Sequence, residues 1–92
     1  LLSISSGVNV QFENGKKMNI YGILEANGTS GNEVYFTRND STDTWQGLNF
    51  QHGASGDLEY ANIQYVTNGN GYAVYADSTA LTLNHCIIEH ND

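Results

Sequence analysis

The sequence has few basic residues, a single cysteine and no long apolar run, and each absence excludes a class of protein. Three Lys and Arg residues stand against ten Asp and Glu, which gives a formal net charge of −7. A nucleic-acid-binding face needs clustered cations, and three cannot build one. One cysteine excludes an internal disulfide framework and a multi-cysteine zinc site. No stretch approaches the roughly 18 apolar residues of a membrane-spanning helix, so we expect no membrane insertion.

The sequence also lacks the 3.6-residue apolar period of an amphipathic helix, and short runs with a period of two take its place. In runs such as VQF, MNI, VYF, LNF and LTL, two apolar residues flank a variable one. This alternation is typical of short strands with one buried face. Pairs such as Asn14-Gly15 and Asn27-Gly28 separate the runs, and both residue types accept the backbone of tight turns. The chain is therefore predicted to be all-β, with one domain over residues 1–92.

The strand-like runs recur at a nearly constant distance along the chain. We align them in three columns, which begin at Val10, Val34, Ile63 and Ile88; at Met18, Leu48 and Val74; and at Leu2, Leu24, Leu58 and Leu83. The steps in the first column are 24, 29 and 25 residues, and the polar segment 38–45 accounts for the longest. Three short strands per repeat predict a coil that climbs around an axis, in which each strand pairs in parallel with its counterpart one coil later.

This repeat predicts a parallel β-helix, or solenoid, of about four coils. We place its boundaries at a partial coil 1–15 and at coils 16–40, 41–69 and 70–92. Equivalent inward residues should stack, and an aromatic column is expected from Phe12, Phe36 and Tyr65, continued by His90. Cys86 takes the place of Ala61 one repeat earlier, so it is predicted to be a small buried residue.

Five longer pieces carry the repeat: SGV-x-V-x-F at 6–12, GILEANGT at 22–29, V-x-FT at 34–37, W-x-G-L-x-F at 45–50 and LEYANIQY at 58–65. They resemble the right-handed parallel β-helix repeats of the pectate-lyase-like superfamily of secreted bacterial proteins. The resemblance implies a right-handed coil and an extracellular or cell-surface location. Neither end shows the cap that natural solenoids place on their terminal coils. We therefore expect an uncapped fragment that stacks on neighbouring coils of a longer chain or on another copy.

Trp45, Tyr35 and Tyr75 are the candidates for binding a carbohydrate. Trp45 lies in the polar segment, and the two tyrosines occupy predicted outward positions. Exposed aromatic rings stack on the faces of sugars, which is the basis of this prediction. In the alternative interpretation, Trp45 folds back and covers its own coil.

Asp40 and Asp43 are the candidate metal ligands. The loop around them is rich in oxygen ligands of the kind that Ca²⁺ prefers, although it lacks the spacing of an EF-hand. A solvated turn is the other interpretation. His85 and His90 are expected on opposite faces of a strand, so no shared transition-metal site is predicted for them.

Glu25 and Glu59 are expected to face outward on adjacent coils, with Asp57 close by. Glycosidases use two carboxylates at a defined separation, so this group is the place where a polysaccharide-cleaving site would lie. A solvated acidic face is the simpler interpretation, and we assign no catalytic residue.

The superfamily includes lyases, hydrolases, adhesins and structural shafts, so the resemblance leaves the function open. We expect a structural or adhesive repeat module of a secreted or cell-surface protein, with end-to-end stacking into a fibre as an extension. The alternatives are part of a polysaccharide lyase or hydrolase, and a carbohydrate-binding β-helix. Apart from Ca²⁺, no cofactor is predicted.

Overall fold

The computed structural model describes residues 1–67, 73–76 and 80–89. These residues form strands and turns, and none of them forms a helix of the length and hydropathy that a bilayer span requires. The strands make three parallel sheets: sheet A with β1 (Leu2–Ser5), β4 (Ile23–Asn27), β7 (Ser55–Glu59) and β10 (Ala80–Asn84); sheet B with β2 (Asn9–Phe12), β5 (Val34–Arg38), β8 (Ala61–Gln64) and β11 (Ile87–Glu89); and sheet C with β3 (Met18–Ile20), β6 (Leu48–Phe50) and β9 (Val74–Ala76).

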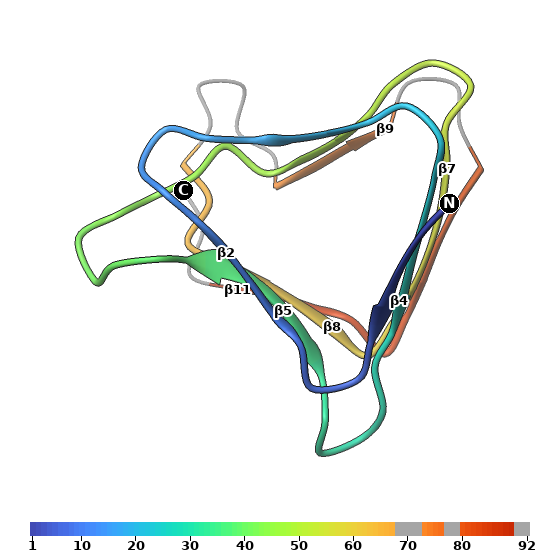
Figure 1. Cartoon of the computed structure of the whole chain (residues 1–92), viewed down its shortest axis with the longest axis horizontal. Coiled ribbons are helices and arrows are strands. Elements are labelled where there is room, and N and C mark those ends of the chain that lie inside the picture. Colours follow the sequence, from blue (N-terminus) through green and yellow to red (C-terminus); the bar gives the residue numbers. More distant parts are fainter. Residues whose placement is uncertain (68–72, 77–79, 90–92) are drawn as a thin grey trace.

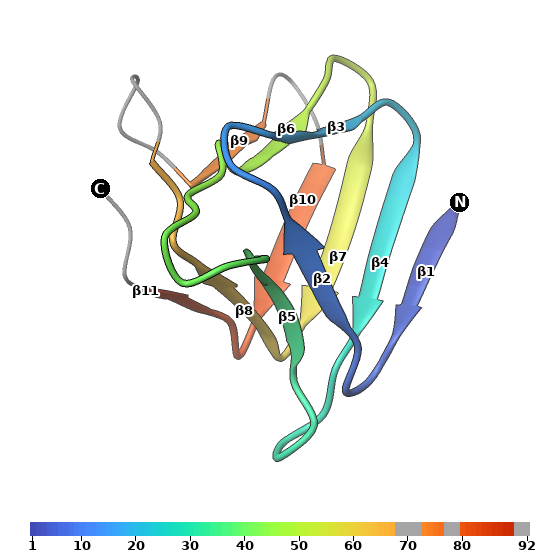
Figure 2. The ribbon, with the colours of Figure 1, turned by 60° about the vertical axis from the view of Figure 1, so that its left-hand side comes forward.

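Consecutive strands belong to different sheets, and each of the strands β1 to β8 pairs with the strand three places later in the chain. Viewed down its shortest axis, the molecule is a triangle whose sides are the three sheets (Figure 1). The chain runs clockwise around this triangle as it recedes from the viewer, which makes the coil right-handed (Figure 1). Figure 2 shows the four strands of sheet A side by side, with β1 and β10 at the two edges. The prediction of an all-β parallel solenoid is confirmed.

The number of coils is lower than the predicted four. Strands β1–β3, β4–β6 and β7–β9 make about three turns, and β10 and β11 begin the next. The molecule measures 31 × 31 × 18 Å, and its short dimension is the solenoid axis. Four strands stacked at about 4.8 Å span about 14 Å between backbones, which agrees with that dimension.

One of the three predicted columns has the expected register throughout. In sheet C, Met18 lies beside Leu48, and Leu48 lies beside Val74. In sheet A the prediction is correct at the two edges, where Leu2 lies beside Leu24 and Leu58 lies beside Leu83. Between β4 and β7 it is wrong by two residues, because Ala26 and not Leu24 lies beside Leu58. These inward ladders confirm that the apolar period in the sequence corresponds to one turn of the solenoid.

The register predicted for sheet B is wrong by two residues on β5. Val10 lies beside Phe36 rather than Val34, and Phe36 lies beside Ile63. Val34 instead faces Ala61. A two-residue shift leaves the same face of a strand inward, so the apolar pattern alone cannot distinguish the two registers.

The predicted aromatic column is consequently absent from the described part of sheet B. Phe12 lies beside Arg38 in the ladder, and its ring stacks on Trp45. Tyr65 follows the end of β8, where its ring lies under the Arg38 guanidinium. His90, the fourth predicted member, lies outside the described residues. The inward column of sheet B is aliphatic except for Phe36.

The core is a stack of inward side chains that is driest in the middle of the molecule. Phe36, Phe50 and Trp45 are fully buried there. Gly56 occupies an inward position on β7, and a Cβ at that position would lie 2.5 Å from the Phe50 ring. The missing side chain therefore makes room for an aromatic ring on the neighbouring sheet. Gly47 is required for a different reason, because its φ of +91° is in the left-handed region.

Candidate functional site

The structure buries Trp45, the first of the three predicted sugar-binding residues. Its side chain is inaccessible, and its ring stacks on Phe12 with centroids 4.0 Å apart and an interplanar angle of 3°. The indole Nε1 donates a hydrogen bond of 2.6 Å to the main-chain oxygen of Gln64. A sugar cannot reach this ring, so its position matches the alternative interpretation, in which Trp45 covers its own coil.

Tyr35 and Tyr75 lie on different sides of the triangle. Tyr35 is half-buried on β5 of sheet B, where it is in register with Asn62. Tyr75 is exposed on β9 of sheet C, where it is in register with Asn49. The two rings therefore do not form one binding face together. A role for either tyrosine in carbohydrate binding stays a prediction.

The loop that carries Asp40 and Asp43 is closed by its own hydrogen bonds and by an arginine. The Asp43 amide donates to the main-chain oxygen of Asp40 at 2.9 Å. Arg38 donates from Nη1 to the main-chain oxygen of Ser41 at 2.7 Å, while its guanidinium lies 3.5 Å from the centre of the Tyr65 ring. Loop carbonyls are typical Ca²⁺ ligands, and here a positive charge already binds one of them. A Ca²⁺ site at Asp40 and Asp43 stays a prediction.

Acidic side chains form a short row on the outer surface of sheet A. Glu25 and Glu59 face outward on adjacent strands as expected, but they are not direct neighbours. Glu25 is in register with Asp57, and Glu59 is in register with Asn27. In-register residues of parallel strands are about 4.8 Å apart at their backbones. Across the described residues, no group of three or more Asp, Glu, His or Cys side chains is arranged to hold a metal ion.

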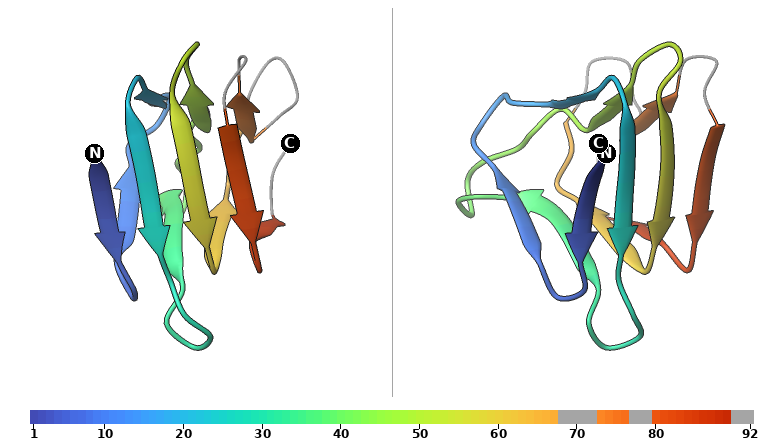
Figure 3. Two further views of the ribbon diagram at one scale, coloured as in Figure 1. Left: turned by 90° about the vertical axis from the view of Figure 1, so that its right-hand side faces the viewer. Right: turned by 45° about the vertical axis from the view of Figure 1, so that its right-hand side comes forward.

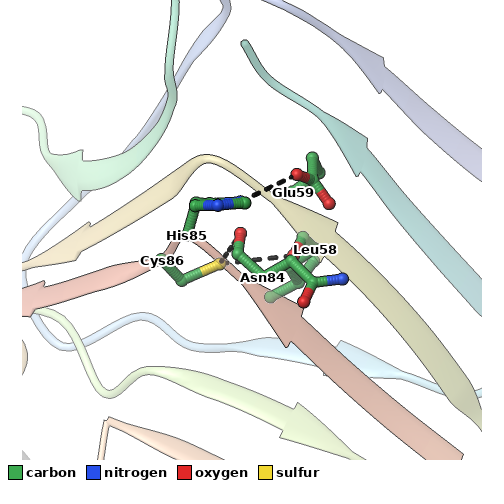
Figure 4. Close-up of polar contacts among 5 residues, drawn as sticks. All are labelled: Leu58, Glu59, Asn84, His85 and Cys86. Carbon is green, nitrogen blue, oxygen red and sulfur yellow. Dashed lines mark hydrogen bonds and ion pairs between the residues drawn. The ribbon is translucent and has the colours of Figure 1, made fainter. Parts of the chain in front are cut away.

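One corner of the solenoid, between sheets A and B, repeats its backbone conformation in successive turns. Tyr60 and His85 both have positive φ, of 49° and 54°, and their rings stack with centroids 4.5 Å apart. Figure 4 shows the His85 ring directed at Glu59, and the Nδ1–Oε1 distance is 3.2 Å. Histidine is among the residue types that tolerate positive φ, whereas a bulky residue such as Tyr60 rarely adopts it.

Cys86 lies next to this corner, immediately before β11. Its Sγ is 3.3 Å from the main-chain oxygen of Leu58 and 3.4 Å from that of Asn84, so its single S–H has two alternative acceptors (Figure 4). The side chain packs against the core, but it is half-buried rather than buried. The prediction of a small buried residue is correct in that Cys86 packs against the core, and wrong in that the side chain is only half-buried.

The outer surface of sheet B carries a hydrogen-bonded polar ladder that the sequence did not reveal. Thr37 donates to Gln64 Oε1 at 3.1 Å, and Gln64 Nε2 donates to Glu89 Oε2 at 2.9 Å. Asn62 Nδ2 donates to the same carboxylate oxygen at 2.9 Å. Asn62 is only 5% exposed, and its Oδ1 has no hydrogen-bond partner among the described residues. The only sequence signal for this ladder is the spacing of its members, which becomes readable once the register of sheet B is known.

Large exposed apolar side chains lie at the ends of the solenoid and also on its outer faces. Among the described residues they are Leu1, Leu2, Val8, Tyr21, Ile23, Tyr75, Leu83, Ile87 and Ile88. Ile23, Tyr75 and Ile87 occupy outward strand positions, and Ile23 belongs to β4 of the second turn. At the N-terminal end, a hollow of about 300 Å³ lies at the corner of β1, β3 and β4, and Leu1, Leu2 and Met18 line it. At the ends, inward apolar side chains such as Leu2 and Ile88 are exposed, whereas their counterparts in the middle turns are buried.

Comparison of the chain with protein-family models, curated proteins and solved structures finds no match. Evidence for the function of the chain therefore comes from its fold and its surfaces.

Proposed function

We propose that the chain is a structural repeat module of a secreted or cell-surface β-helix protein, and that it associates with further coils through its two ends. The observation that carries this proposal is that inward apolar side chains are exposed at the two ends of the stack, at Leu2 and Val8 and at Leu83 and Ile88. Exposed apolar side chains that lie together mark interaction sites in soluble proteins. We also propose that the chain belongs to the pectate-lyase-like superfamily, which the resemblance of its repeat sequences supports.

The physics of a solenoid explains why the ends should associate. Each turn buries its inward side chains against the turn before and the turn after, so stability grows with every interface between turns. An end turn has only one such interface, and its sheet edges present unpaired backbone groups. Covering Leu83 and Ile88, which are 40% and 49% exposed, would complete the same inward columns that are dry in the middle of the molecule.

The charge of the module fits a structural role. The acidic row of Glu25, Asp57 and Glu59 lies on the outer surface of sheet A, away from the ends of the stack. Charge on this outer surface would keep stacked modules soluble and would oppose their lateral association.

Sedimentation velocity over a series of protein concentrations tests this proposal. We expect the mean mass to rise with concentration for the wild type. Leu83→Lys should lower this association, because it places a charge on the apolar end of the stack. Thr82→Lys is the matched control, since Thr82 is the neighbouring residue on β10 and faces outward. A monomeric wild type at every concentration, or equal association of Leu83→Lys and the wild type, would contradict the proposal.

A polysaccharide-processing segment is the second candidate, and the acidic row on sheet A is the observation that favours it. Glu25 and Asp57 are in-register neighbours on an open sheet face, where an extended glycan could lie. Binding of acidic and neutral glycans to the wild type, lost in a Glu25→Gln, Asp57→Asn double variant, would support it. Glycan binding that the double variant retains would exclude this row as the site.

A further inference from the structure

We propose that two copies of the chain stack head to tail, so that β10 and β11 of one copy continue sheets A and B onto β1 and β2 of the next. This inference rests on the proposed function, which requires only that the ends associate. It adds a direction and a register to that association, and it names the residues that meet across the junction.

The order of the strands supplies the direction. β1 and β10 are the opposite edges of sheet A, and β2 and β11 are the opposite edges of sheet B. All four strands of sheet A point in the same direction, as Figure 3 shows. A copy that is translated along the axis therefore presents β1 in parallel to β10, with the same pairing that joins the turns within one chain. A copy that is turned over presents antiparallel strands and breaks every inward column.

The inward columns supply the register. In sheet B the ladder runs from Val10 through Phe36 and Ile63 to Ile88, so the next position above Ile88 is Val10 of the second copy. A second inward ladder begins at Val8, one residue before β2, and ends at Cys86, one residue before β11. At the free ends Val8 is 40% exposed and Ile88 is 49% exposed. The junction would bury both, as the central turns bury their counterparts.

The outward ladders meet without like charges at the junction. Glu89 would face Gln11 of the second copy, and the Gln11 carboxamide could donate to that carboxylate as Gln64 does on the other side. On sheet A, Asn84 would face Ser5 of the second copy. No acidic residue of these ladders therefore faces another acidic residue across the junction, which removes one source of electrostatic repulsion between copies.

Disulfide cross-linking tests the direction, and the single native cysteine makes the design simple. In the proposed stack, Cys86 of one copy is the in-register neighbour of residue 8 of the next. Strands about 4.8 Å apart satisfy the Cα separation of about 4.4–6.8 Å that a disulfide needs. We expect Val8→Cys to give a ladder of covalent multimers after mild oxidation. The wild type, which has only Cys86, and the Val8→Cys, Cys86→Ser double variant should both stay monomeric on the same gel.

The other cross-linking patterns would overturn the inference. Dimers of the double variant would show head-to-head contact, and dimers of the wild type would show tail-to-tail contact. A second pair, Ser5→Cys with Asn84→Cys in a Cys86→Ser background, uses exposed positions that leave the core intact. If both pairs fail to cross-link while sedimentation shows association, the head-to-tail register is wrong and the proposed function stands. If sedimentation shows no association, the head-to-tail stack and the proposed function are both wrong.

Discussion

Replacement of Trp45 gives the sharpest prediction for the stability of the fold. The indole is buried, stacks on Phe12 and donates a hydrogen bond to the main chain of Gln64. It holds a long polar segment against the end of β8, through a bridge between Trp45 and Val66. Trp45→Ala removes the ring and leaves a cavity, whereas Trp45→Phe keeps a ring and loses the donor.

The magnitudes follow from these contacts. Truncation of a buried aromatic residue to alanine lowers the free energy of unfolding by about 3–5 kcal/mol. Loss of the hydrogen bond alone lowers it by about 1–3 kcal/mol, because the Gln64 carbonyl loses its partner. Since native proteins have a total stability of about 5–15 kcal/mol, Trp45→Ala should remove a large part of the free energy of unfolding, and Trp45→Phe a smaller part.

Urea unfolding followed by far-UV circular dichroism, on dilute protein, measures these differences. The matched control is Tyr21→Ala, because Tyr21 is an aromatic residue that is largely exposed, and its loss should change stability by less than about 0.5 kcal/mol. Trp45 is the only tryptophan, so the wild-type fluorescence should also resist quenching by acrylamide. Equal effects of Trp45→Ala and Tyr21→Ala, or full quenching of the wild type, would refute the burial of this ring.

Two further predictions concern a glycine and a buried amide. Gly56→Ala should lower the thermal unfolding temperature, because the new methyl group would overlap the Phe50 ring, whereas Gly22→Ala has open space and should be nearly neutral. An equal effect of both changes would contradict this packing. Asn62→Asp should lower the free energy of unfolding by about 2 kcal/mol or more, because it places a second carboxylate at a buried position next to Glu89. Glu89→Gln should restore part of that loss in a double-mutant cycle, and purely additive effects would argue against the contact.

The sequence predicted the fold where its apolar pattern had only one solution. Sheet C illustrates this, since the MNI and LNF runs are isolated between turns and can align in one way. In sheet B, Val34 and Phe36 are both apolar and both face inward, so two registers had equal merit. The same ambiguity affects sheet A, where Leu24 and Ala26 both face inward and Ala26 lies beside Leu58. The choice between two such registers depends on three-dimensional contacts and not on the period.

The candidate sites were harder to predict because exposure is a tertiary property. A tryptophan in a polar segment suggests an exposed ring, yet the ring of Trp45 is covered by the loop and the neighbouring turn. Asn62 lies at an outward position of its strand, where the alternating pattern predicts exposure, and it is nevertheless buried beside Glu89. In both cases the neighbouring turns, rather than local sequence, decide what solvent reaches.

Alkylation of Cys86 tests most directly whether the ends of the solenoid are its interaction surface. Cys86 lies half-buried at the C-terminal end, where a second copy would cover it. We expect the alkylation rate to fall as the protein concentration rises, and Leu83→Lys to abolish this dependence. An alkylation rate that is the same at every concentration of the folded wild type would contradict this expectation.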